Sequence, residues 1–144
     1  MEIKEIKNWF EVAIPEPTIE QACIQIGCHF EEVAEMAIAI GDDSVGCELE
    51  SCADEYKSMR YASYLKGVSK LDNEQKLDLL DSLCDQIVTA IGVAHMLGMD
   101  IESALAEVNR SNHSKFEDGK AVFNEQGKIS KGKNYTPPDL ARFI

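Results

Sequence analysis

The chain has 144 residues, 44% of them hydrophobic, and a formal net charge of −12. This length suits one domain, 1–144, with a small core. The charge argues against a surface that binds DNA or RNA, and no apolar run approaches the roughly 20 residues of a membrane span. The five cysteines form no CxxC pair, so we expect reduced, mostly buried thiols. Residues 1–10 carry no apolar leader, and a cytoplasmic protein is expected.

Four helices are predicted along a body that runs from about 18 to 112. Thr18 and Gln21 form a capping box, and the apolar residues after it recur every three to four positions, which predicts a helix over about 18–40. Further helices are expected over about 44–66, 72–98 and 100–111, and Asp72 with Gln75 forms a second capping box at the start of the helix over 72–98. The pattern is typical of an all-α fold, a bundle of about four helices.

A loop-rich tail is expected over about 113–144, where glycines and Pro137-Pro138 follow the last helix. The tail could hold a short hairpin around 121–123 and 128–129. Positions 110 to 142 contain seven basic and four acidic residues. A basic tail on an acidic body suits an anionic ligand, although a solvated tail lying on that body explains the charges equally well.

The helix expected over 72–98 is apolar on more than one side, with Ile87, Val88, Ile91, Val93 and Met96 spread around it. A helix of this kind is buried all round. Four helices in one chain can scarcely bury it, so we expect oligomerisation to complete the bundle, as a homodimer or homotetramer.

Glutamates cluster in the first long helix, at Glu31, Glu32 and Glu35. Carboxylates three and four residues apart share a helix face. No basic residue falls between Glu20 and Lys57, and unpaired carboxylates beside a core are costly. Magnesium, which prefers oxygen ligands, would relieve that cost.

A second acidic cluster, on the helix over 72–98, consists of Asp78, Asp81 and Asp85. Asp81 and Asp85 lie four apart and are predicted to complete a metal site with the glutamates. The alternative is an acidic surface that only keeps the protein soluble. No residue three before a histidine is a glutamate, which argues against a di-iron bundle, and no glycine-rich phosphate loop occurs.

Three stretches resemble one known family, the MazG-like all-α nucleoside triphosphate pyrophosphohydrolases. They are Glu31-Glu32-Val-Ala-Glu35-Met36, Asp85-Gln-Ile-Val-Thr-Ala-Ile-Gly92, and Glu107-Val-Asn109-Arg-Ser-Asn112-His-Ser-Lys115-Phe. The tail from Gly127 to Asp139 is similar to that of phage-type members, which would place the protein in a host cytoplasm. The match covers roughly 20–140.

The resemblance implies hydrolysis of a (deoxy)nucleoside triphosphate to the monophosphate and diphosphate, with two or three Mg²⁺ or Mn²⁺ ions per site. It implies Glu32, Glu35 and Asp85 as metal ligands and Glu31 or Glu35 as the base. The family's other acidic ligand falls at Ser82, so we favour Asp81 or, failing that, Asp78. The substrate contacts so implied or suggested are Asn109, Asn112, Lys115, Lys128, Lys131 and Tyr135.

Control of the dNTP pool, with dGTP as one possible substrate, is the function that the resemblance favours. A base pocket could draw on Trp9, Phe10, Ile14 and Gln25, although such aromatic residues more often belong to a core. Two alternatives stay open. One keeps the chemistry but acts on dUTP, dCTP, phosphoribosyl-ATP or an oxidised nucleotide; the other is a non-catalytic acidic helical interaction protein.

Overall fold

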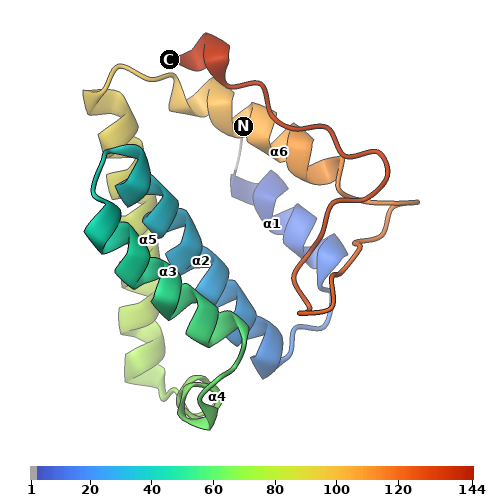
Figure 1. Ribbon diagram of the computed structural model, residues 1–144. Coiled ribbons are helices and arrows are strands. Elements are labelled where there is room, and N and C mark those ends of the chain that lie inside the picture. The colour runs from blue at the N-terminus through green and yellow to red at the C-terminus, as the bar shows by residue number, and fades with distance from the viewer. Residues whose placement is uncertain (1–2) are drawn as a thin grey trace. The chain divides into compact units, whose positions relative to one another are not determined.

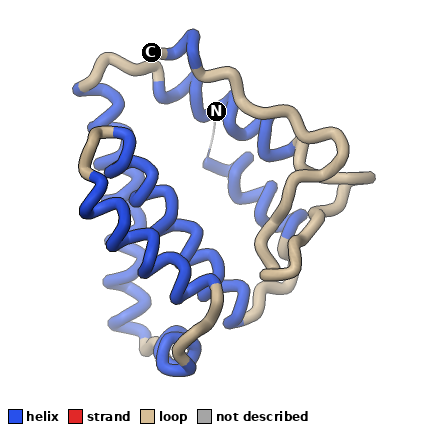
Figure 2. The backbone as a smooth tube through the Cα atoms, in the orientation of Figure 1, coloured by secondary structure: helices blue, strands red, loops and turns tan. Residues whose placement is uncertain are grey.

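The computed structural model describes residues 3–144, and these are mainly helical (Figures 1 and 2). In chain order the helices are α1 (Ile3–Ala13), α2 (Ile19–Ala39), α3 (Asp43–Lys57), α4 (Ala62–Ser69), α5 (Asn73–Met96), α6 (Ile101–His113) and the 3₁₀ turn η1 (Ala141–Phe143). The all-α prediction is confirmed. Within this range no helix combines the length and apolar character that crossing a membrane requires.

The chain divides into two compact units. One unit holds α1, α5, α6 and most of the tail, and the other holds α2, α3, α4 and the short segment Phe123–Lys128. The prediction of a single domain stays a prediction. The chain folds back on itself where the short hairpin was expected, with bridge positions at 123 and 129 but no regular strand: the Asn124 amide donates to the Lys128 carbonyl over 2.9 Å and the Ser130 amide donates to the Val122 carbonyl over 2.7 Å.

Both predicted capping boxes are present. The Gln21 amide donates to Thr18 Oγ1 over 3.2 Å, and the Thr18 amide donates back to Gln21 Oε1 over 2.9 Å. At the start of α5 the matching distances, between Asp72 and Gln75, are 2.9 and 3.0 Å. Side chains thus satisfy amides that have no partner inside the helix, which sets where α2 and α5 begin.

Helices α2 and α3 form an antiparallel pair built on small residues (Figure 1). Gly41, at φ +88°, turns the chain between them. The residues buried along the pair are Cys23, Ile24, Gly27, Ala34, Ala37, Gly46 and Ala53. Because all of these except Ile24 are small, the two backbones approach closely and the side chains that flank the contact reach across it.

The helix predicted over 44–66 is wrong in its continuity, because it breaks after Lys57 into α3 and α4. Met59 adopts a left-handed φ of +49°, and no glycine marks the position. Tyr64 of α4 then stacks on Tyr56 of α3, with ring centroids 4.4 Å apart and planes 6° apart. The bend is therefore coupled to an aromatic contact between residues that the sequence pattern does not relate.

Helix α1 was not predicted, and it carries the aromatic core of its unit. Trp9 is only 7% exposed and stacks on Phe116, with ring centroids 5.5 Å apart and planes 12° apart. Phe10 meets the edge of Trp9. Trp9 is thus a core residue of this unit, which leaves its flat face covered by Phe116 rather than open to a base.

Helix α5 exposes large apolar side chains along its length, including Leu77, Leu80, Leu83, Ile87, Val88, Ile91, Val93 and Met96. Its buried residue is Ala94. The exposed apolar surface of α5 is what the expected oligomer would cover, and that assembly stays a prediction.

The free thiols differ from expectation, since Cys47 and Cys84 are exposed and only Cys23 is buried.

Candidate functional site between helices α2 and α3

A cleft of about 270 Å³ lies between α2 and α3, and most of its lining is acidic. The residues that line it are Glu31, Glu35, Glu50, Ala53, Asp54 and Lys57. Glu31 and Glu35 are one helical turn apart on α2, and Glu50 and Asp54 are one turn apart on α3. Each pair shares a helix face, so four carboxylates from two helices border one cleft.

Gly27 allows α2 and α3 to approach closely beside this cleft. A Cβ atom at Gly27 would lie 2.7 Å from the carbonyl oxygen of Ala53 and 2.7 Å from Cγ of Lys57. The aliphatic stem of Lys57 therefore occupies the space that a side chain at Gly27 would need. From there the ammonium group reaches Glu31, one turn further along α2.

Two lysines hold the carboxylate of Glu31. Lys57 Nζ lies 3.0 Å from Oε1, and Lys128 Nζ, from a turn 97 residues away in sequence, lies 2.6 Å from Oε2. Lys57 Nζ also lies 3.2 Å from Asp54, so it bridges the two helices. Carboxylates on the facing sides of α2 and α3 repel one another and need positive charge between them. In this arrangement the ammonium groups of the two lysines supply that charge.

These contacts shift the ionisation of the groups involved. Burial raises the pKa of Glu31, but the hydrogen bonds from Lys128 and Lys57 outweigh it and leave that pKa below its ordinary value. Burial lowers the pKa of Lys57, and its hydrogen bonds to Glu31 and Asp54 more than reverse that effect. Glu31 is therefore a charged, strongly held carboxylate near neutral pH.

The predicted metal ligands are not all brought together. Glu35 lines the cleft, whereas Glu32 is exposed on α2 and is not among the lining residues. Asp81 and Asp85 lie exposed on α5, in the other compact unit, and the same is true of the alternatives Asp78 and Ser82. Their part in a metal site stays a prediction. Among residues 3–144, no three His, Cys, Asp or Glu side chains already converge as a metal-binding set.

Glu50, Asp54 and Lys57 were missed by the sequence reasoning. A signal for them exists: their spacing of four and three residues places them on one face of α3. The short turn around Gly41 also makes α3 the natural antiparallel neighbour of α2. Asp81 and Asp85, some fifty residues further along the chain, were instead expected to complete the site, because they lie four apart on one helix and Asp85 belongs to the stretch that resembles the family.

Most of the predicted substrate contacts lie in the unit of α1 and α6. Asn109 is buried, and its amide donates to Glu5 of α1 over 3.4 Å beside a pocket of about 310 Å³. Lys131 Nζ lies 4.8 Å from the ring centroid of Tyr135. Asn112 and Lys115 are half-buried at the end of α6 and just beyond it. Lys128 contacts Glu31, which lines the acidic cleft.

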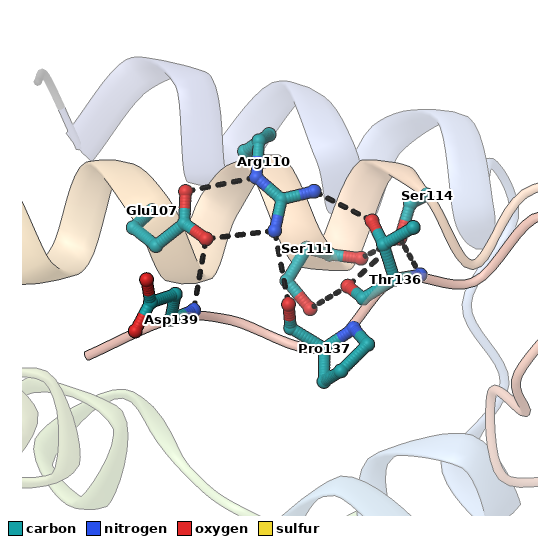
Figure 3. Close-up of polar contacts among 7 residues, drawn as sticks. All are labelled: Glu107, Arg110, Ser111, Ser114, Thr136, Pro137 and Asp139. Atoms are coloured by element: carbon teal, nitrogen blue, oxygen red, sulfur yellow. Dashed lines mark hydrogen bonds and ion pairs between the residues drawn. The ribbon is translucent and has the colours of Figure 1, made fainter. Parts of the chain in front are cut away.

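Polar residues of the stretch from 107 to 115 also hold the C-terminal tail against α6 (Figure 3). Arg110 donates to Thr136 Oγ1 over 2.6 Å and to the Pro137 carbonyl over 3.1 Å. Ser111 donates to the Thr136 carbonyl over 2.9 Å, and Glu107 accepts from the Asp139 amide over 3.0 Å. Part of this stretch is therefore committed to anchoring the tail.

Comparison of the chain with models of known protein families, with curated proteins and with solved structures finds no match.

Proposed function

We propose that the chain is a metal-dependent nucleoside triphosphate pyrophosphohydrolase that converts a dNTP and water to a dNMP and diphosphate. The observation that carries the proposal is the cleft between α2 and α3, which four carboxylates border and where two lysines contact Glu31. The resemblance to MazG-like enzymes supports the same chemistry, with dGTP as one possible substrate.

The donor set of the cleft fits Mg²⁺ or Mn²⁺, because carboxylate oxygens are the ligands these hard cations take. Glu35, Glu50 and Asp54 border the cleft without converging, and they would hold the metal once their side chains turn towards one another, with Glu31 joining them when a lysine leaves it. Asp81 and Asp85 of α5 remain candidate ligands. When bound, the ions would supply Lewis-acid polarisation of the phosphates and a lower pKa for the attacking water.

The chain's own residues then carry the hydrolysis. The water oxygen attacks the α-phosphorus, the bond from that phosphorus to the α–β bridging oxygen breaks, and diphosphate leaves with the electron pair. Glu31 or Glu35 accepts the proton of the water. Lys57 and Lys128 neutralise the charge that collects on the departing diphosphate, a task for which lysine serves as a point charge.

A panel of dNTPs, dUTP, phosphoribosyl-ATP and 8-oxo-dGTP, each incubated with Mg²⁺, tests the proposal. Release of nucleoside monophosphate and diphosphate in equal amounts is expected. Release of orthophosphate together with a nucleoside diphosphate would contradict cleavage between the α- and β-phosphates. Glu35→Gln should abolish turnover and leave the circular dichroism spectrum unchanged. Glu16→Gln, an exposed site outside the cleft, is the matched control.

A non-catalytic acidic interaction protein is the second candidate. It is favoured by one observation: both oxygens of Glu31 already have ammonium partners, so no metal is needed to balance that carboxylate. Isothermal titration with Mn²⁺ separates the two. Binding together with cleavage of any nucleotide in the panel supports the enzyme, and absence of both supports the interaction protein.

A further inference from the structure

Glu31 is held differently by its two lysines. Lys57 belongs to the same helix pair, is 16% exposed, and has its stem packed in the space over Gly27. It also keeps Asp54 as a second carboxylate partner. Lys128 is 39% exposed, and Glu31 is its ion-pair partner. Of the two, Lys128 is the one that can leave without disturbing the packing of α2 against α3.

The turn that carries Lys128 is built to present it. Asn124 Oδ1 accepts hydrogen bonds from the amides of Gln126 and Lys128, over 3.0 and 2.9 Å. Gly127 adopts a left-handed φ of +77°, and a Cβ added there would lie 3.3 Å from Cδ1 of Ile24 on α2. The backbone of the turn therefore rests close to α2, while the side chain of Lys128 stays partly exposed.

We propose that Lys128 is a displaceable counter-ion of Glu31. In the structure its ammonium group contacts Oε2; when a divalent cation and a polyphosphate enter the cleft, the cation takes that oxygen and the freed ammonium binds a phosphate oxygen. The proposal rests on the proposed function for its ligand, a polyphosphate bound with a divalent metal. It assigns Lys128 two successive partners rather than a fixed structural ion pair.

Because the Lys128 ammonium group and a metal ion exclude each other at Glu31 Oε2, the direction in which each binding affinity changes can be predicted. Two cations cannot both sit at hydrogen-bonding distance from Oε2 without strong repulsion. Removing the ammonium group should therefore tighten the binding of a metal by itself. The same removal should weaken the binding of a metal–polyphosphate complex, because a phosphate oxygen loses its positive partner. A purely structural ion pair would not move the two affinities in opposite directions.

Isothermal titration of Lys128→Met tests this, with Mn²⁺ alone and with an α,β-methylene dNTP in the presence of Mn²⁺. We expect Mn²⁺ to bind about three- to tenfold more tightly and the analogue about three- to tenfold more weakly, the range that suits a half-exposed charge pair. Lys120→Met, which changes an exposed lysine elsewhere in the tail, should change neither affinity. Affinities that stay constant, or that move in the same direction, would overturn the proposal.

Hydrogen exchange of the wild-type chain gives a second measurement that needs no variant. Saturating Mn²⁺ should accelerate exchange of the Gln126 and Lys128 amides, and the analogue should restore their protection; unchanged protection would overturn the proposal. If the wild-type protein cleaves dNTPs but Lys128→Met changes neither affinity, the counter-ion proposal is refuted and the enzyme proposal survives. Opposite shifts in a protein that cleaves nothing refute the enzyme and leave the counter-ion.

Discussion

Replacing Gly27 by alanine should separate the two helices that form the acidic cleft. The added Cβ would lie 2.7 Å from the Ala53 carbonyl oxygen, 2.7 Å from Cγ of Lys57 and 3.0 Å from the Lys57 amide nitrogen. Ordinary contact begins at 3.4 Å, so the closest atoms are about 0.7 Å too near. Two of the three are backbone atoms of α3, and they cannot swing aside as a side chain would.

The size of the effect follows from three opposing contributions. Overpacking of this kind costs about 1–3 kcal/mol, and disturbing the partly buried pair of Lys57 and Glu31 adds up to about 1 kcal/mol. Alanine recovers roughly 1 kcal/mol because it favours the helix more than glycine does. The net loss is about 2 kcal/mol, which lowers the midpoint of thermal unfolding by about 4–8 °C in a chain of this size.

Circular dichroism at increasing temperature measures this midpoint, and Gly67→Ala is the matched control. Gly67 lies in α4 of the same unit, and a Cβ there meets no atom within 4 Å. The control should therefore gain up to about 1 kcal/mol from helix propensity alone. A Gly27→Ala protein as stable as the wild type would refute the close approach of α2 and α3 at this point.

Three further predictions concern the other unit. Hydrogen bonds from Arg110 and from the Asp139 amide hold the pKa of Glu107 at about 2, below its ordinary 4.5; this lowered pKa means that the tail contact stabilises the fold fully above pH 4.5 and is lost as the pH falls through 2. The protection factor of the Asp139 amide should drop over that pH window, and in Glu107→Gln it should already be low at pH 7. Constant protection would exclude the contact between Glu107 and the tail. Light scattering should find a homodimer or homotetramer, and Leu83→Glu on the exposed face of α5 should shift it towards monomer; a monomeric wild type would contradict the expected assembly. Asp72→Ala removes the cap of α5 and should cost about 1 kcal/mol in urea unfolding, whereas an unchanged midpoint would mean that the cap adds no stability.

The sequence determined where most helices begin, because capping is a local interaction. Thr18 with Gln21 and Asp72 with Gln75 act within one turn, so their hydrogen bonds could be inferred from spacing alone. Helix α1 and the break before α4 were missed. The break depends on a left-handed residue, Met59, which carries none of the usual turn signals.

The candidate site could be predicted only in part, for the same physical reason. The spacing of Glu31 and Glu35 showed that they share a helix face, and the structure places both at one cleft. The spacing did not show which segments of the chain lie opposite these two glutamates. Glu31 had no basic neighbour in its own helix and was expected to need a metal, yet Lys57 and Lys128 reach it from 26 and 97 residues away.

What the sequence by itself settled was therefore the helical character of the chain and the acidic face of α2, since both follow from interactions within a few residues. The tertiary structure alone decided that α3 supplies Glu50, Asp54 and Lys57, because two small residues, Gly27 and Ala53, let the helices approach closely enough for those side chains to meet. Contacts of this kind depend on the shapes of both surfaces, and neither surface can be read from one segment alone.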